Sequence, residues 1–245
     1  MEDSRRNVGE VVEPTIIETL ISLKGKHVES LGIVINSVAT YYGKEYPVGT
    51  KRTNIMKAPG EAKRDVTING KGYSLKSSRA SPPAIVNHST REKWLRVCKR
   101  VGVKIDMLDE MVSEYWELRT NHRIGEDVLT SSIYCPFGNT KTRQQYLKIL
   151  LDYFLFNGTG SSDSRYPADY ILEFASSTDQ NTWRILDSAS AVYSMWPKMV
   201  FSIRSKKGMP SNYPNIGALK KAQMEPWVRY INGDYRGALH VRTKR

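Results

Sequence analysis

The amino-acid sequence predicts a mixed α/β fold in which a central mixed β-sheet is flanked by helices. Three observations carry this prediction: an early apolar stripe at helical spacing, an Asn-Gly turn between alternating apolar residues, and a series of short strand-like segments in the last third of the chain. The chain has 245 residues, of which 40% are hydrophobic and 25% charged, and this suits one compact unit with a sizeable core.

Helical spacing of apolar residues marks four segments. The first is expected to begin after Pro14 and to cover residues 15–42, with Gly25 as a point where it bends or divides. Its apolar stripe consists of Ile16, Leu20, Leu23, Val28, Leu31, Ile35 and Val38. The other helices are expected at residues 89–101, 105–118 and 141–156.

Alternating apolar residues mark the strands. Asn69-Gly70 is expected to join residues 63–68 and 72–78 into a hairpin, because this dipeptide favours a tight two-residue turn. Further strands are expected at residues 168–175, 181–186, 198–204, 225–231 and 238–244. The segment PADYILEF (residues 167–174) carries two acids but no following lysine, so we interpret it as a core strand.

The distribution of charge narrows the class of partner. The formal net charge is +12, and residues 198–245 hold 11 Lys and Arg against 2 Asp and Glu, which is +9 of that total. Because basic residues there alternate with tyrosine and tryptophan, we expect a polyanion as partner, most simply nucleic acid. The long apolar run of a membrane span and the Cys/His spacing of a zinc site are both absent from the sequence.

The hairpin holds residue types that suit phosphodiester hydrolysis. That reaction needs a divalent metal, a hard oxygen ligand for it, and a cation near the attacking water or the developing charge. With period-two alternation, Val66, Tyr73 and their apolar neighbours point to the core. Asp65, Ser74 and Lys76 then gather on the opposite face, where Asp65 can bind the metal and Lys76 can act on the water and the phosphate.

The spacing of Asp65, Ser74 and Lys76 resembles the nuclease pattern PD-(D/E)XK. Two residues depart from it: Arg64 stands where the pattern has Pro, and Ser74 stands at the second acid. Another carboxylate or a water molecule must then fill the place of that acid. Glu29, in the segment KGKHVES of the first expected helix, is the candidate accessory carboxylate, and Ser74 would hold a water molecule in the metal site.

Residues after the hairpin are candidates for DNA contact. Ser77, Ser78 and Arg79 follow Lys76 at the end of its strand. Asn87 and His88 are expected at a helix start, where backbone N–H groups favour a phosphate, although a plain N-cap explains Asn87 equally well.

The order of these segments resembles the small MspI-like type II restriction endonucleases of the PD-(D/E)XK superfamily. The resemblance covers about residues 24–231 and is carried by KGKHVES, KRDVTI, GYSLKSS, PADYILEF and FSIRSKKG. It implies a restriction-endonuclease-like fold and Mg²⁺-dependent, site-specific cleavage of double-stranded DNA. Members of this group replace the second acid by an amide residue. The candidate DNA contacts in the basic part are Arg204, Lys206, Lys207, Lys220, Lys221 and Arg229.

Further expectations follow from this resemblance. Residues 1–125 would form a catalytic subdomain and residues 126–245 a basic, β-rich DNA-recognition subdomain of one compact unit. A cognate methyltransferase would act on the same DNA site, and the enzyme would work as a monomer or a homodimer in the cytoplasm of a prokaryote. Two alternatives remain open: a sequence-specific DNA-binding protein without catalysis, and an RNA-binding or RNA-processing protein.

Overall fold

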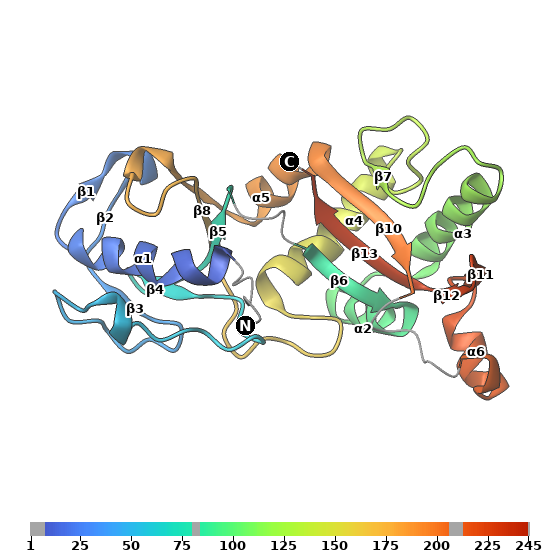
Figure 1. Ribbon diagram of the computed structural model, residues 1–245, viewed down its shortest axis with the longest axis horizontal. Helices are drawn as coiled ribbons and strands as arrows, with labels where there is room; N and C mark the ends of the chain where they lie inside the picture. The colour runs from blue at the N-terminus through green and yellow to red at the C-terminus, as the bar shows by residue number, and fades with distance from the viewer. Residues whose placement is uncertain (1–7, 80–83, 206–212, 245) are drawn as a thin grey trace, which may run out of the picture. The chain divides into compact units, whose positions relative to one another are not determined.

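The computed structural model describes residues 8–79, 84–205 and 213–244. Helices and strands alternate along the chain (Figure 1), which confirms the mixed α+β class that the sequence predicts. Within the described ranges, every helix is too short or too polar to cross a membrane.

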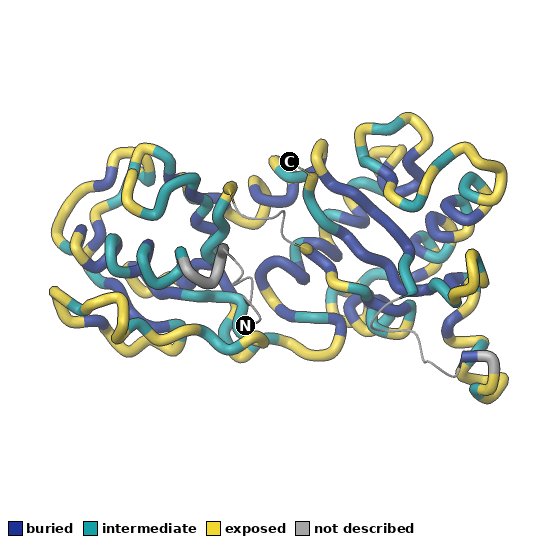
Figure 2. The backbone as a smooth tube through the Cα atoms, in the orientation of Figure 1, coloured by how far each residue is buried: buried dark blue, intermediate teal, exposed yellow. Residues whose placement is uncertain are grey.

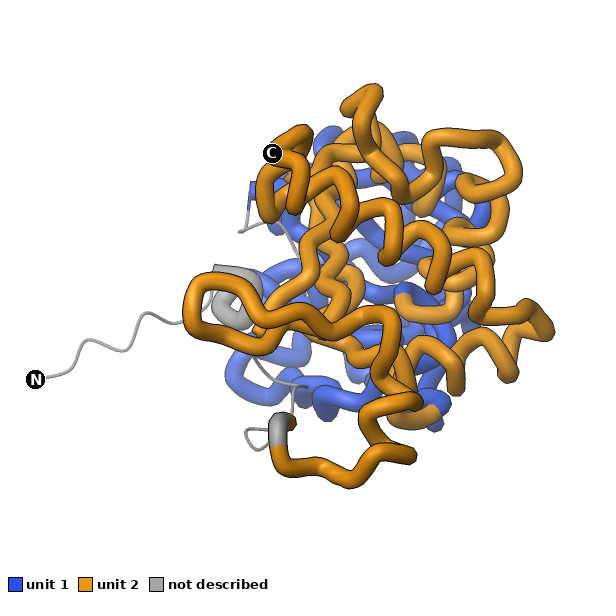
Figure 3. The backbone as a smooth tube through the Cα atoms, turned by 90° about the vertical axis from the view of Figure 1, so that its right-hand side faces the viewer, with its two compact units in different colours: residues 1–81, 155–158, 163–191 blue, residues 82–154, 159–162, 192–245 orange. Residues whose placement is uncertain are grey.

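The chain divides into two compact units, which Figure 3 distinguishes by colour. Unit 1 consists of residues 1–81, 155–158 and 163–191. Unit 2 consists of residues 82–154, 159–162 and 192–245. The subdomain boundary expected near residue 125 falls inside unit 2, and residues 163–191 join the hairpin in unit 1.

Unit 1 is built on a mixed five-stranded sheet in the order β3-β4-β5-β8-β9, in which β5 and β8 are parallel and the other pairs antiparallel. Short β1 and β2 form a separate antiparallel pair. With 3-10 turns labelled η, the elements are α1 (Val8–Ser22), β1 (His27–Val28), η1 (Glu29–Leu31), β2 (Ile33–Val34), β3 (Val38–Thr40), η2 (Arg52–Asn54), β4 (Val66–Ile68), β5 (Lys71–Ser77), β8 (Tyr170–Phe174), η4 (Gln180–Thr182) and β9 (Trp183–Leu186).

Helix α1 covers one face of this sheet, and the contact between them is apolar. Figure 2 marks buried residues along the strands of this sheet. Fully buried side chains of the helix meet fully buried side chains of β4 and β8. The residues of this core that come from the helix and the sheet are Ile16, Ile17, Leu20, Ile21, Val38, Val66, Ile68, Tyr73, Leu172, Phe174 and Trp183. Because these side chains are buried under α1, the alternate residues of each strand point to the opposite face of the sheet.

The prediction of one long first helix is wrong for the residues after Ser22. Helix α1 ends there, and the expected helical segment continues as two short strands and a 3-10 turn. Gly25 has φ +81° and Gly32 has φ +65°, a left-handed conformation that an α-helix does not contain. The apolar residues beyond Ser22 still reach the core, because Val28, Ile35 and Val38 are fully buried from strand and loop positions.

Unit 2 contains an antiparallel sheet in the order β6-β13-β10-β7, a small hairpin of β11 and β12, and most of the helices. Its elements are β6 (Ala84–Thr90), α2 (Arg91–Val101), α3 (Asp106–Thr120), β7 (Val128–Leu129), α4 (Lys141–Asp152), η5 (Trp196–Lys198), β10 (Met199–Arg204), η6 (Tyr213–Asn215), α6 (Ala218–Met224), β11 (Arg229–Ile231), β12 (Asp234–Arg236) and β13 (Ala238–Thr243). The π-helical turn η3 (Tyr153–Asn157) and helix α5 (Ser188–Met195) each contain residues of both units.

The helices of unit 2 pack on one face of its sheet. Phe137 stacks on Phe201 of β10 with ring centroids 4.6 Å apart, and Tyr115 of α3 lies against Phe137. Phe201 and its register partner Val241 therefore face the helices. The next residues along each strand point to the other face, and they include Ser202, Arg204, His240 and Arg242.

Candidate active site

The Asn69-Gly70 hairpin forms as predicted and places Asp65 opposite Ser74. Val66 pairs with Tyr73 across β4 and β5, and the backbone N–H of Asp65 donates to the carbonyl oxygen of Tyr73 at 2.8 Å. Val66 and Tyr73 point to the core under α1. Because side chains alternate along a strand, Asp65, Ser74 and Lys76 lie on the face away from α1.

The carboxylate of Asp65 is held by hydrogen bonds from β5. Its Oδ2 accepts from the backbone N–H of Leu75 at 2.7 Å and from Ser74 Oγ at 3.3 Å. Both bonds between these described residues end on Oδ2, which leaves Oδ1 as the oxygen available to a metal. Burial raises the pKa of the Asp65 carboxyl, although the ammonium groups of Lys76 and Lys63 and these hydrogen bonds act against the rise.

Lys63 joins this site although the sequence pattern did not single it out. The pKa of the Lys63 ammonium group is lowered to about 8, because burial and, to a lesser degree, repulsion from Lys76 lower it more than Asp65 raises it. Lys63 and Lys76 therefore both lie near Asp65. Lys63 is the first residue of the expected strand 63–68, but the nuclease pattern has no place for it, so the signal in the sequence was its position two residues before Asp65.

Glu173 is the carboxylate that the sheet brings beside Lys76. In the parallel pair of β5 and β8, Lys76 is the register partner of Glu173, so their side chains leave the sheet on the same face. Glu173 Oε2 forms an ion pair with Arg184 Nε of β9, its register partner on the other side. The segment PADYILEF is a core strand as predicted, since Leu172 and Phe174 are buried, but the same strand also delivers Glu173 to the site.

Asp169, the other acid of that segment, has a structural role. Its Oδ2 accepts from the backbone N–H of Gly72 at 2.7 Å, and its own N–H donates to the Gly72 carbonyl at 2.8 Å. These two bonds fix the start of β8 against β5. They set the register that puts Glu173 next to Lys76.

Glu29 does not lie where the sequence placed it. It begins the turn η1 instead of standing on a long helix, and its side chain is exposed. The neighbours of this turn are β9 and η4, with Ser30 Oγ donating to the carbonyl oxygen of Gln180. The register of the sheet brings Glu173, and not Glu29, to the side of Lys76.

The oxygen donors present fit a magnesium ion. Mg²⁺ in proteins is typically held by one or two carboxylates, with water and substrate phosphate completing its shell. Asp65 and Glu173 supply two carboxylates on one face, and Ser74 supplies a hydroxyl that is hydrogen-bonded to Asp65. Within the described part of the chain, no three His, Cys, Asp or Glu side chains cluster closely enough to hold a metal alone.

The residues that follow Lys76 lie at the end of β5. Ser77 is the last residue of the strand, and Ser78 donates from its N–H to the carbonyl oxygen of Phe174 at 2.8 Å. Arg79 is exposed in the turn beyond. Their expected position is confirmed, and their contact with DNA stays a prediction.

The helix start expected at Asn87 and His88 is wrong, because both residues lie within strand β6. Helix α2 begins at Arg91 with Thr90 as its N-cap. His88 has φ +44°, and its ring stacks on His240 with centroids 4.5 Å apart. The pKa of His240 is lowered to about 4, mainly by burial and next by His88, and the two rings form a stacked pair in unit 2.

The candidate DNA-contacting basic residues of the C-terminal part differ from one another in their surroundings. Arg204 is tied to Asp127 at 3.0 Å and to Glu126 at 3.5 Å. Lys220 and Lys221 stand on helix α6, and Arg229 begins β11. Lys206 and Lys207 lie outside the described residues.

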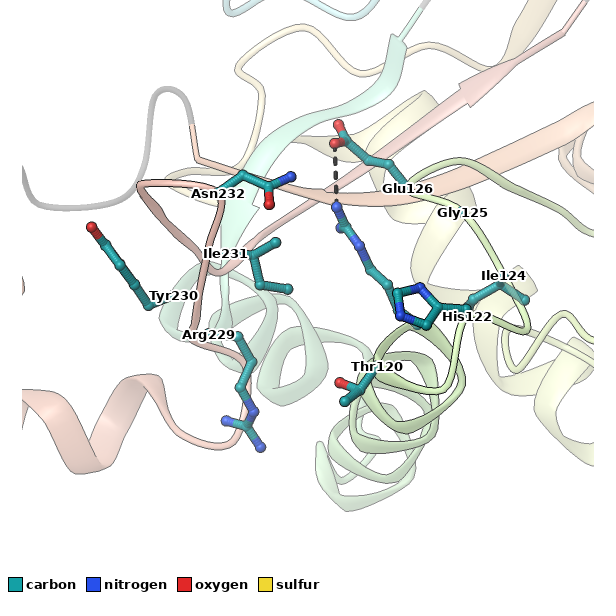
Figure 4. A pocket seen from close by; sticks show the side chains of 10 residues that line it. Thr120, His122, Ile124, Gly125, Glu126, Arg229, Tyr230, Ile231 and Asn232 are labelled. Carbon is teal, nitrogen blue, oxygen red and sulfur yellow. Dashed lines mark ion pairs between the residues drawn. The ribbon is translucent and has the colours of Figure 1, made fainter.

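A pocket of about 540 Å³ lies between the end of α3 and the β11–β12 hairpin (Figure 4). Arg119 is ion-paired with Glu126 at 3.5 Å. The pocket is lined by Arg119, Thr120, His122, Ile124, Gly125, Glu126, Arg229, Tyr230, Ile231 and Asn232. It belongs entirely to unit 2 and contains none of the residues around Asp65.

Comparisons with known proteins give one structural likeness. No family model matches the chain, and no curated protein sequence matches it. The crystal structure of restriction endonuclease MspI in complex with its cognate DNA is similar at 12% sequence identity and a TM-score of 0.33, covering 95% of this chain and 77% of that chain. The functional argument therefore rests on the side chains around Asp65 and Lys76.

Proposed function

We propose that the protein is a Mg²⁺-dependent endonuclease that hydrolyses phosphodiester bonds of double-stranded DNA at a specific sequence. One observation carries the proposal: Asp65, Ser74 and Lys76 meet on one face of the unit 1 sheet, with Glu173 beside Lys76. A partly buried carboxylate next to a lysine is an arrangement that binds a cation and a phosphate together.

Each residue has a role in this proposal. Asp65 and Glu173 hold the metal, which when bound polarises the phosphate and makes a water molecule more acidic. Lys76 donates to the phosphate and stabilises the negative charge that develops there as a water oxygen bonds to phosphorus and one ester bond breaks. Ser74 donates to Asp65 and orients its carboxylate. Lys63 adds positive charge on the same side.

The finer expectations belong to the same proposal. A site-specific enzyme of this type would be paired with a methyltransferase that modifies the same DNA sequence. The basic residues of unit 2 suit contacts to the DNA backbone and to guanine edges in the major groove. Such an enzyme would work as a monomer or a homodimer in the cytoplasm of a prokaryote.

A second candidate is a sequence-specific DNA-binding protein without catalysis. Ser74 favours it, because a hydroxyl is a weak replacement for the second acid. The ion pair between Glu173 and Arg184 also favours it, since that pair occupies one carboxylate. The two candidates share DNA binding and differ in metal-dependent cleavage.

The experiment that separates them incubates the purified protein with unmethylated phage DNA, with Mg²⁺ in one sample and EDTA in the other. Discrete fragments that form only with Mg²⁺ support the endonuclease. Intact DNA that is shifted in a native gel supports binding alone. Intact DNA without a shift contradicts both.

A further inference from the structure

The β11–β12 hairpin presents an exposed tyrosine at the end of a row of aromatic rings. Tyr230 is 63% exposed. Its ring lies 4.8 Å from that of Tyr235, its register partner, and the Tyr235 ring lies 4.9 Å from that of Tyr213. Tyr213 is buried and anchors the row in a small core with Met224. Packing along this row therefore fixes the orientation of the exposed Tyr230 ring.

The hairpin that carries Tyr230 is tightly built. Asn232 and Gly233 form its turn with φ +53° and +83°, the left-handed values of a two-residue turn that follows the strand twist. In Figure 4, Ile231 and Asn232 point toward the pocket beside α3, whereas the Tyr230 ring points away from it. A ring that is already oriented loses little conformational entropy when a flat ligand stacks on it.

Positive charge lies next to this ring. Arg229 is ion-paired with Glu225 at 3.4 Å, and both side chains are about half exposed, 46% and 48%. Exposed ion pairs of this kind contribute little to stability, typically ~0–1 kcal/mol. A phosphate can therefore replace the Glu225 carboxylate as the partner of Arg229. From residue 213 to residue 244 the sequence holds six Lys and Arg against two Asp and Glu.

Another face of unit 2 has the opposite charge. The exposed side of α3 carries an acidic series that would repel a polyanion: Asp106, Asp109, Glu110, Glu114 and Glu117. Two of these acids are compensated, since Asp109 pairs with Arg91 and Glu114 with Arg143. This contrast favours a polyanion at the hairpin and α6 over the acidic face of α3.

We propose that the β11–β12 hairpin is a DNA-contacting element in which Tyr230 stacks on a base at an opened base step and Arg229 binds a neighbouring phosphate. Aromatic stacking and phosphate contact by an adjacent cation are how proteins hold unstacked nucleotides. The inference rests on the proposed function, because it takes double-stranded DNA as the partner. It adds a base-contacting residue that the basic residues alone do not provide.

The test measures the affinity of the full chain for unmethylated phage DNA fragments in EDTA, over a series of salt concentrations. Tyr230→Ala is expected to weaken binding about 5- to 100-fold, the range of a lost stacking contact, without changing the slope of affinity against salt. Tyr230→Phe keeps the ring and is expected to bind as the wild type does. Arg229→Ala is expected to reduce the salt slope by about one, as for one lost phosphate contact.

Tyr193 provides the matched control, since it is 70% exposed and lies on α5, outside this hairpin. Tyr193→Ala is expected to bind as the wild type does. Equal affinity of wild type and Tyr230→Ala, or an equal loss in Tyr193→Ala, would overturn the stacking role. If the wild type cuts DNA while Tyr230→Ala binds normally, only this inference fails. If Tyr230→Ala weakens binding while no metal supports cutting, the nuclease proposal fails and the hairpin assignment stands.

Discussion

Lys76 and Glu173 are register partners on adjacent parallel strands, although 97 residues of sequence separate them. This pairing places a carboxylate next to the lysine of the nuclease-like pattern, in a chain that has Ser74 at the pattern's second acid. The face that they share also contains Asp65, which accepts a hydrogen bond from Ser74.

Glu173→Gln is expected to reduce cleavage about 10- to 100-fold and to raise the Mg²⁺ concentration needed for half-maximal activity, because an amide is a weaker metal donor than a carboxylate. Arg184→Ala provides the matched control. It breaks the same ion pair but leaves the Glu173 carboxylate in place. Steady-state cleavage against Mg²⁺ concentration is the measurement, and equal losses in the two variants would show that Glu173 acts only as a partner of Arg184.

Ser74→Asp is expected to make the fold more dependent on Mg²⁺. Ser74 Oγ lies 3.3 Å from Asp65 Oδ2 and is 3% exposed, so a second carboxylate there would repel the first in EDTA. Bound Mg²⁺ would relieve that repulsion, and saturation at a hundred times the dissociation constant adds about 2.7 kcal/mol of stability. Ser74→Asn has the same size without the charge. Thermal unfolding of both variants with Mg²⁺ and with EDTA is the measurement, and an equal response to Mg²⁺ contradicts the metal site.

Asp65→Asn is expected to abolish cleavage and to stabilise the metal-free protein at neutral pH. Burial raises the pKa of Asp65 in the folded chain, so ionisation of this carboxyl costs stability as the pH rises through the unfolded value of about 3.9 toward the folded one. The cost is complete above the folded pKa and absent at lower pH, where Asp and Asn variants should unfold alike. Melting temperatures in EDTA at neutral and acidic pH test this, and a less stable Asn variant at neutral pH would contradict it.

Gly72→Ala is expected to destabilise unit 1 by about 1–3 kcal/mol, the usual cost of overpacking. A Cβ at Gly72 would stand 2.7 Å from Arg64 Cδ and 3.0 Å from the carbonyl oxygen of Pro167, which is backbone and cannot swing away. Because Gly72 also fixes β8 through Asp169, cleavage should fall as well. Gly60→Ala, with no heavy atom within 4 Å, is the control. Urea unfolding of both variants is the measurement, and equal midpoints would contradict the close approach.

The local part of the candidate site could be predicted from the sequence. Asp65, Ser74 and Lys76 surround one Asn-Gly turn, and their alternation with Val66 and Tyr73 decides which face each occupies. No contact with a distant segment is needed for that step. The hairpin, helices α2, α3 and α4, and core strand β8 were therefore predicted correctly in type and place.

The remaining part depends on contacts between distant segments. Glu173 reaches Lys76 only because β5 and β8 pair in parallel, which no short spacing reveals. The strand containing Asn87 and His88 exists because it pairs with β13 near the end of the chain. The apolar stripe after Ser22 fits a helix, but its residues are buried from short strands and loops. In each case tertiary pairing overrode the local pattern.

The central claim is that the face holding Asp65 and Lys76 cuts DNA, and one comparison tests it most directly. Wild type, Lys76→Ala and Lys71→Ala are purified in parallel and incubated with unmethylated phage DNA and Mg²⁺, with binding measured separately in EDTA. Lys71 lies on the same strand but is exposed at the turn. We predict that Lys76→Ala loses at least about 100-fold in cleavage rate, as for the loss of a single charge-stabilising donor, while its DNA affinity and the activity of Lys71→Ala stay unchanged. Cleavage by Lys76→Ala at the wild-type rate would contradict the claim.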